Sequence, residues 1–227
     1  MTTQEFFTEL DARIAKYDLL CHPFYKAWSA GELTRDDLRN YGQNYFHHVN
    51  AFPEYLQAFA SRLPAGGVRR AVEANHDDEM GLPGSRPHSE LWLDFVEGMG
   101  GERAATVTPL TEIDALMQRF HSVAREGGSE EALATFYAYE SQVPRVAAEK
   151  SRGLQQMYSA DAKTREYFNL HRTADVYHSG VWKQQLANAV EGDTEAAERA
   201  LNAGESAAKA LWNALDGIEA QRMARAA

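Results

Sequence analysis

The sequence predicts an all-helical protein, and two observations carry that prediction. Apolar residues recur at intervals of three and four, as in "EFFTELDARIAKY" and "DDLRNYGQNYFHHVNAFPEYLQAFASRL", whereas alternating strand patterns are scarce. Turn and N-cap residues precede these segments, as in "GELT" before "RDDL" and "EGDT" before "EAAERAL". We therefore expect about seven to nine helices in one bundle.

The expected helices follow one another with short turns and no linker or repeat. Their ranges are roughly 3–17, 22–30, 35–62, 66–80, 88–99, 110–126, 129–157, 160–190 and 194–223. Pro53 and Pro144 lie inside two of these segments. Because proline removes a backbone donor and crowds the preceding turn, we expect a kink or break at both positions.

Length and composition are those of a folded protein. The chain has 227 residues and an apolar share of 44 %, which is too rich for disorder. This length suffices to bury a core, so we expect a single helical domain over residues 1–227.

Charge and hydropathy exclude two classes of partner. The formal charge of −10 repels phosphate backbones and anionic membrane surfaces, and no stretch gathers enough lysine and arginine to offset it. No segment approaches the length of a membrane span, and the start "MTTQEFFTELDARIAKY" lacks the layout of a signal peptide. The single cysteine, Cys21, cannot form an internal disulfide. We therefore expect a cytoplasmic protein that binds neither nucleic acid nor membrane.

The segment "FNLHRTADVYHSGVW" carries the first indication of chemistry. His171, Asp175 and His178 are four and then three residues apart, so a helix places two imidazoles and a carboxylate on one stripe. Such a stripe is typical of metal ligands, and the alternative is a polar network or an exposed face. Apolar neighbours argue against an exposed face: Phe168, Val176, Tyr177 and Trp182.

Further candidate ligands lie on helices that otherwise look buried, since a dimetal bundle needs several inward carboxylates and histidines. Glu140 lies in "ATFYAYESQVPRVAAEK", Glu79 ends the acidic cluster of "NHDDEMGLPGSRPHSELWLDF", and His88 begins the next helix. Mixed nitrogen and oxygen ligands suit iron and manganese, and zinc is not excluded. The sequence therefore indicates an oxygen-activating dimetal centre.

The remaining histidines have simpler interpretations. His47 and His48 face about 100° apart on a helix and are expected to line the core or a cavity. His22 precedes Pro23 and is expected to begin a helix, whereas His76 and His121 look like surface residues.

Four motifs in this order resemble a known family. They are "HPFYKAWSAGELTRDDLRNYGQNYFHHV", the "DDE…H…ELW" segment, "FYAYESQVPRVAAEK" and HxxxDxxH. Together they resemble the haem-oxygenase-like diiron oxidases and, within them, the group of the Chlamydia protein associating with death domains. The likeness spans roughly residues 20 to 190.

The resemblance implies a seven-helix haem-oxygenase-like bundle, of the kind also seen in TenA and PqqC, that binds no haem. It implies two metal ions, either two irons or iron with manganese. The implied ligands are Glu79, His88, Glu140, His171, Asp175 and His178. The loop before His88 is about two residues longer than in the family, so Asp78 is an alternative to Glu79.

The same resemblance implies synthesis of para-aminobenzoate, a folate precursor, from the protein's own side chains, with oxygen and a reductant as co-substrates. Tyr25 matches the consumed tyrosine and Lys150 the lysine implicated as amino donor. Tyr41, Tyr139 and Tyr167 match further tyrosines near the metals.

Both key matches also have ordinary explanations. Tyr25 sits where a core residue beside Phe24 and Trp28 would lie, and "AAEKSRG" around Lys150 resembles a solvated helix face. Yet a phenol beside a dimetal centre is open to oxidation, and a lysine buried there has a lowered pKa, which leaves its amine neutral and nucleophilic.

Three alternatives remain open from the sequence. A PqqC-like member of the fold would act without metal, and a TenA-like member would use a cysteine nucleophile, for which Cys21 is poorly placed before "HPFY". An interaction protein that binds partners such as death domains would use the acidic surface for docking. Bundles of this type commonly form homodimers, which we expect here.

Overall fold

The computed structural model describes residues 1–82, 84–104 and 107–226, and in these residues it contains helices and no strand. The helices are α1 (Thr3–Ala15), the 3₁₀ helix η1 (Leu19–Cys21), α2 (Pro23–Ala30), α3 (Arg35–Arg62), α4 (Gly67–Glu79), α5 (His88–Gly98), α6 (Thr111–Glu126), α7 (Ser129–Glu140), α8 (Val143–Met157), α9 (Glu166–Val190) and α10 (Thr194–Ala226). The all-helical prediction is confirmed.

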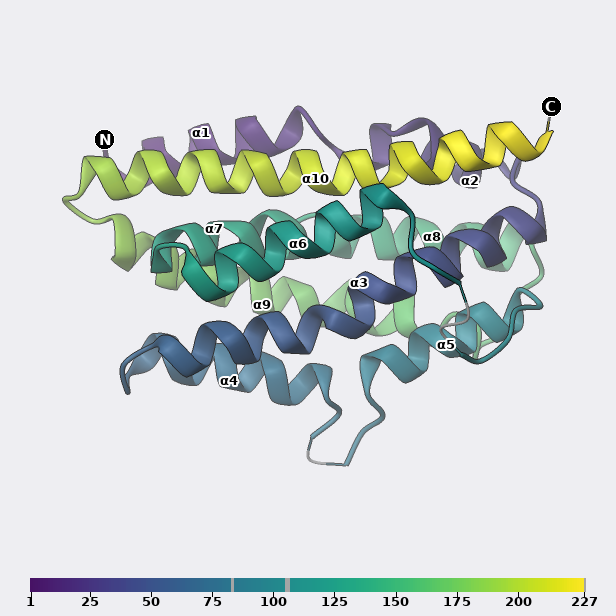
Figure 1. Cartoon of the computed structure of the whole chain (residues 1–227), viewed down its shortest axis with the longest axis horizontal. Coiled ribbons are helices and arrows are strands. Elements are labelled where there is room, and N and C mark those ends of the chain that lie inside the picture. Colours follow the sequence, from purple (N-terminus) through teal and green to yellow (C-terminus); the bar gives the residue numbers. More distant parts are fainter. Residues whose placement is uncertain (83, 105–106, 227) are drawn as a thin grey trace.

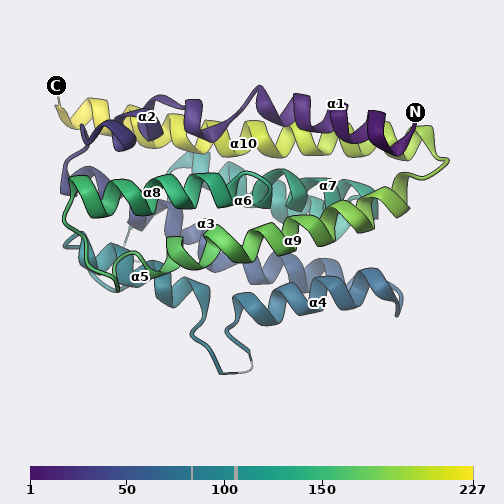
Figure 2. The same ribbon diagram turned by 180° about the vertical axis from the view of Figure 1, so that it is seen from behind.

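The helices form stacked layers. α10 lies along α1 and α2 at one side, α6, α7 and α8 lie beneath it, and α4 and α5 lie at the opposite side (Figures 1 and 2). α9 packs against α7 and α8, and α3 packs against α4, α5 and α6. Candidate ligands carried by α4, α5, α7 and α9 thus come from helices that meet in the interior.

Two helix starts follow the predicted capping signals. The hydroxyl of Thr34 accepts from the Asp37 amide at 3.1 Å, and the Asp37 carboxylate accepts from the Thr34 amide at 2.9 Å, which forms a capping box. Asp193 accepts from the Ala196 amide at 2.9 Å where α10 begins. Local side-chain chemistry therefore determines these boundaries.

The two prolines have different effects. The predicted helix 129–157 is broken into α7 and α8, and Pro144 occupies the first turn of α8. α3 runs from Arg35 to Arg62 through Pro53, so no break occurs there. One lost hydrogen bond does not end α3, because its buried aromatic side chains hold the helix on both sides of the proline.

Helix α9 starts later than the sequence suggests. It begins at Glu166 rather than near residue 160, because Asp161 accepts from the Thr164 amide at 2.8 Å in a turn. None of the helices in the described residues combines the length and apolarity that crossing a membrane requires.

Aromatic rings fill the centre of the bundle. The Trp28 ring centroid lies 5.5 Å from that of Tyr41 and 5.9 Å from that of Phe95. Gly153 on α8 allows α2 to approach, since a Cβ at Gly153 would lie 2.8 Å from Trp28 Cδ1. Close packing at this point depends on the missing side chain.

We expect Gly153→Ala to lower the free energy of unfolding by about 1–3 kcal/mol, because the added methyl group would overlap the Trp28 ring, which is 1 % exposed. The melting temperature should fall by about 2–4 °C for each kcal/mol. Gly180→Ala is the matched control, since Gly180 lies in the exposed part of α9 with no atom within 4 Å of its Cβ position. Urea and thermal unfolding measure both. Equal stability of the two variants would contradict the close approach of α2 and α8.

Candidate metal centre

Helix α9 directs three polar side chains into the bundle. His171, Asp175 and His178 are 3, 2 and 5 % exposed, so the stripe predicted from their spacing lies in the interior. Burial of two imidazoles and a carboxylate is costly unless they are paired or bind a metal. The exposed-face alternative is thereby wrong.

Only two of the four apolar neighbours of that stripe are buried. Phe168 and Trp182 are buried, but Val176 and Tyr177 are 61 and 72 % exposed. These two residues directly follow Asp175, and a helix turns about 100° per residue, so they lie on the opposite face.

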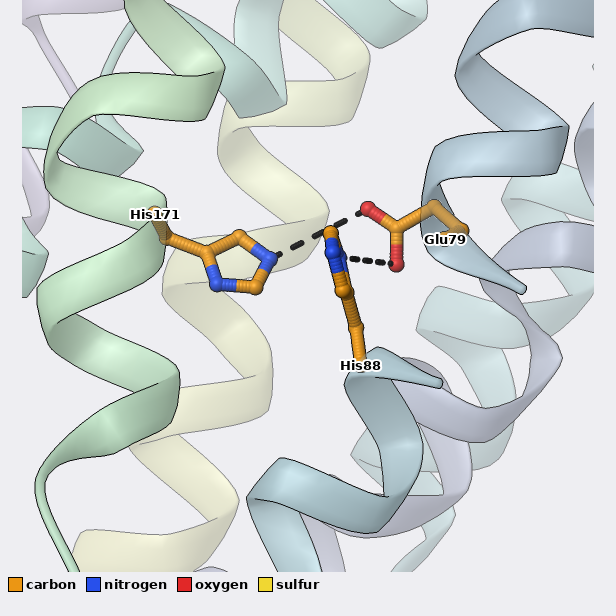
Figure 3. A group of neighbouring side chains, drawn as sticks. All are labelled: Glu79, His88 and His171. Atoms are coloured by element: carbon orange, nitrogen blue, oxygen red, sulfur yellow. Dashed lines mark ion pairs between the residues drawn. The ribbon is translucent and has the colours of Figure 1, made fainter. Parts of the chain in front are cut away.

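The first group of candidate ligands joins three helices. Figure 3 shows Glu79 from α4, His88 from α5 and His171 from α9 pointing toward one another. His88 Nδ1 lies 3.0 Å from Glu79 Oε2, and His171 Nε2 lies 3.9 Å from Glu79 Oε1. One ligand atom from each residue lies within 4.8 Å of the others, which is suitable for a single ion.

A loop with a glycine near its start connects the first two of these candidate ligands. Glu79 is the last residue of α4 and His88 the first of α5. Gly81 has a φ of +71°, and a Cβ there would lie 2.6 Å from the Ser85 carbonyl oxygen. A glycine is therefore required for the chain to fold back at this point.

The second group also has three buried members. Glu140, Asp175 and His178 offer ligand atoms within 4.8 Å of one another, and His178 Nδ1 lies 3.5 Å from Asp175 Oδ1. Glu140 is the last residue of α7, directly before the break that precedes Pro144. The break thus leaves this carboxylate at a helix end inside the bundle.

The two groups are adjacent. A small cavity is lined by Glu79 and His171 of the first group and by Glu140 and Asp175 of the second. His171, Asp175 and His178 also share one face of α9. The six predicted ligands therefore form one centre with two positions. Glu79 rather than Asp78 joins it, since Glu79 is buried and the Asp78 side chain is 48 % exposed.

Proximity couples the ionisation of these groups. Burial and the nearby Asp175 raise the pKa of Glu140 to about 8. Burial opposes charge on His171, but Asp175 and Glu79 outweigh it and raise the pKa of His171 to about 9. Burial likewise raises the pKa of Glu79, yet the neighbouring His88 and His171 lower it overall. Without metal, protons are shared among the ligands.

Buried atoms that make no hydrogen bond are consistent with metal binding at this centre. His88 Nδ1, Asp175 Oδ1 and His178 Nδ1 are buried and make no hydrogen bond, although each lies within ion-pair distance of another group of the centre. Leaving such an atom unpaired costs about 1–3 kcal/mol. Three imidazoles and three carboxylates would hold two divalent ions, which would satisfy these atoms and balance the carboxylate charge.

Outer contacts orient two of the ligands. The backbone oxygen of Tyr167 lies 2.8 Å from His171 Nδ1, which leaves Nε2 toward Glu79. Asn75 donates to Glu140 at 2.9 Å, and the Trp182 indole N–H donates to the other Glu140 oxygen. Such supports commonly tune metal affinity. Sequence reasoning missed Asn75 and Trp182 as supports.

A lysine lies among tyrosines beside the centre. Lys150 is 6 % exposed and donates to Tyr25 Oη at 2.6 Å and to Tyr41 Oη, and these two hydroxyls are 3.0 Å apart. Burial lowers the pKa of Lys150 well below its usual value. The solvated-face interpretation of Lys150 is therefore wrong, because α8 turns this position toward α2 and α3.

Tyr139 and Tyr167 connect the lysine to the candidate ligands. Both line the cavity that contains Glu79 and Asp175, and both also line the cavity that contains Tyr25 and Lys150. The Tyr167 ring stacks on His171 with centroids 3.9 Å apart. All five predicted tyrosine and lysine positions thus lie in one buried region. Tyr45, which was not predicted, lines the cavity with Lys150 and lies one turn from Tyr41.

The other histidines lie outside both groups. His22 accepts from the Phe24 amide at 3.1 Å and so begins α2, as predicted. His48 is fully buried among aromatic rings, whereas His47 is partly buried and contacts the Val107 carbonyl oxygen at 2.8 Å. His76 and His121 are partly exposed.

Comparison with known proteins agrees with this geometry. A family model described as iron-containing redox enzyme matches residues 39–212. A relative named 4-aminobenzoate synthase, from Nitrosomonas europaea, is 36 % identical over 96 % of this chain and 92 % of its own length. A relative of the same name from Chlamydia trachomatis is 33 % identical over 94 % of this chain and 91 % of its own.

Solved structures show the same fold at lower identity. A haem-oxygenase-like domain of unknown function from Shewanella denitrificans matches with a TM-score of 0.78 and 16 % identity, over 97 % of this chain and 91 % of its own. A CADD-like protein of unknown function from Nostoc punctiforme matches with a TM-score of 0.75 and 17 % identity, over 95 % of this chain and 98 % of its own. The chain therefore belongs to the haem-oxygenase-like family of iron-containing redox enzymes.

Proposed function

We propose that this protein is an oxygen-dependent dimetal oxidase that makes para-aminobenzoate from its own Tyr25 side chain, with Lys150 as amino donor. The observation that carries the proposal is the 2.6 Å contact between Lys150 Nζ and Tyr25 Oη, buried beside six candidate metal ligands. The names of the two relatives above support the product class.

The chemical structures of tyrosine and product agree with this arrangement. Para-aminobenzoate carries a carboxylate and an amine at opposite ends of a benzene ring. The tyrosine side chain carries its methylene carbon and its hydroxyl at the same two positions. The amine of Lys150 lies next to the hydroxyl, at the end of the ring where the nitrogen of the product must be placed.

Burial prepares the lysine for this role. An amine forms a new bond through its lone pair, which is free only in the neutral form. Burial lowers the pKa of Lys150 and so favours the neutral form. Tyr41 holds the amine by a hydrogen bond on its other side. The nitrogen is thereby fixed against Tyr25, which is 3 % exposed, and bulk water is kept away.

The metals proposed here are two irons, or iron with manganese, because three histidines and three carboxylates suit both. Glu79, His88 and His171 would hold one ion, and Glu140, Asp175 and His178 the other. When bound, such ions supply redox chemistry with oxygen, and an external reductant supplies the electrons. Tyr139 and Tyr167 occupy the space between them and Tyr25. A consumed side chain limits each protein to one turnover.

Loss of Tyr25 should abolish product. We expect wild-type protein, loaded with iron with or without manganese and given reductant and oxygen, to form at most one para-aminobenzoate per chain and to lose the corresponding mass. Tyr25→Phe and His171→Ala should form none. Tyr137→Phe is the matched control, because its hydroxyl contacts Asp11 away from the centre. Chromatography and intact-protein mass spectrometry measure product and mass.

Protein labelled with ¹⁵N only in lysine should yield product one mass unit heavier. Unlabelled product would exclude Lys150 as donor. Many turnovers per chain would instead indicate an external substrate and contradict self-consumption.

The lowered pKa of Lys150 also predicts a pH-dependent stability difference. Between the folded and unfolded pKa values the unfolded chain binds one more proton, so stability rises with pH by about 1.4 kcal/mol per unit. Lys150→Met removes this dependence. We therefore expect Lys150→Met to be more stable than wild type, by a difference in free energy of unfolding that is largest at pH 7 and shrinks toward pH 9. Urea unfolding at each pH measures this difference. A gain independent of pH would mean that the buried amine stays charged.

A further inference from the structure

His178 has carboxylates at both of its ring nitrogens. Nδ1 lies 3.5 Å from Asp175 Oδ1, and Nε2 lies 3.0 Å from Asp78 Oδ2. Asp78 directly precedes Glu79 at the end of α4. One helix end thus supplies a candidate ligand to the first group and an acid that contacts a member of the second.

The two contacts differ in their surroundings. The His178 side chain is 6 % exposed and Nδ1 has no hydrogen-bond partner, whereas the Asp78 side chain is 48 % exposed. An imidazole that binds a metal ion through one nitrogen carries its proton on the other, and Asp78 lies at hydrogen-bond distance from Nε2, where it would accept that proton. The lone pair of Nδ1 is then available inside the second group.

Asp78 is reachable from solvent. Asp78 and His178 line a surface pocket between α4 and α9, whose walls include Ala74, Leu82 and Val181. Asn75 and Trp182, which contact Glu140, line the same pocket. The outer contacts of the second group and His178 therefore border this pocket, whereas Glu140 and Asp175 are 1 and 2 % exposed.

We propose that Asp78 is a positioning residue of the metal centre: it holds the ring and the tautomer of His178 so that Nδ1 binds the second ion. This inference rests on the dimetal function proposed above. It assigns Asp78 an outer role in place of the ligand role that the sequence left open.

Anaerobic titration of the metal-free full-length protein with Mn²⁺, with free ion measured by electron paramagnetic resonance, tests the role. Wild type should bind two ions. Asp78→Ala should keep one site and weaken the other by about 10- to 100-fold. Asp77→Ala is the matched control, since the neighbouring Asp77 is exposed and contacts His76 instead. The melting temperature of metal-free Asp78→Ala should match that of the control.

The open pocket allows a second, independent readout. Added formate should occupy the space left in Asp78→Ala and restore Mn²⁺ affinity at the weakened site, because it replaces the lost carboxylate. Asp175→Ala should not be restored, since Asp175 is buried and 2 % exposed. Wild type in the same formate concentration corrects for binding of Mn²⁺ by formate.

The outcomes separate this inference from the proposed function. If wild type binds two ions and Asp78→Ala binds both with unchanged affinity, the role of Asp78 is overturned but the dimetal centre is not. The role of Asp78 is also overturned if Asp78→Ala lowers the Mn²⁺ affinity of both sites equally. It is overturned as well if formate does not restore the lowered affinity. Fewer than two ions in wild type would overturn the dimetal centre and the role of Asp78 together.

Discussion

Burial of three carboxylates and three imidazoles within a helical bundle is the constraint on which the rest of the structure depends. Such groups are costly to remove from water unless something pairs with each of them. The contacts among the six residues leave some buried nitrogen and oxygen atoms without a hydrogen bond. Two bound cations would offset the cost of burying these groups, which makes the polar cluster a candidate metal centre.

Helix ends place three of the six candidate ligands. Glu79 ends α4, His88 begins α5 and Glu140 ends α7, whereas α9 supplies the other three candidate ligands from one continuous face. Side chains at helix ends approach a common point without two long helices having to cross there. The glycine turn after α4 and the break before Pro144 therefore serve the centre as much as the fold.

The aromatic core and the polar centre are parts of one arrangement. Tyr139 and Tyr167 belong to both cavities, and Lys150 lies where aromatic rings exclude water but provide hydroxyl partners. A low-dielectric region that disfavours charge on the lysine thus adjoins a centre rich in charge. The same packing that stabilises the bundle disfavours charge on the amine and holds it close to a phenol.

The sequence by itself determined the helical class, the helix starts at Thr34 and Asp193, and the stripe of His171, Asp175 and His178, because capping and helical periodicity are local. It did not determine the burial of Lys150, the exposure of Tyr177 or the contact of Asp78 with His178. A helix with polar residues on several faces has no local signal for which face meets its neighbours. Only the packing of α4, α8 and α9 decided which of these side chains face the centre.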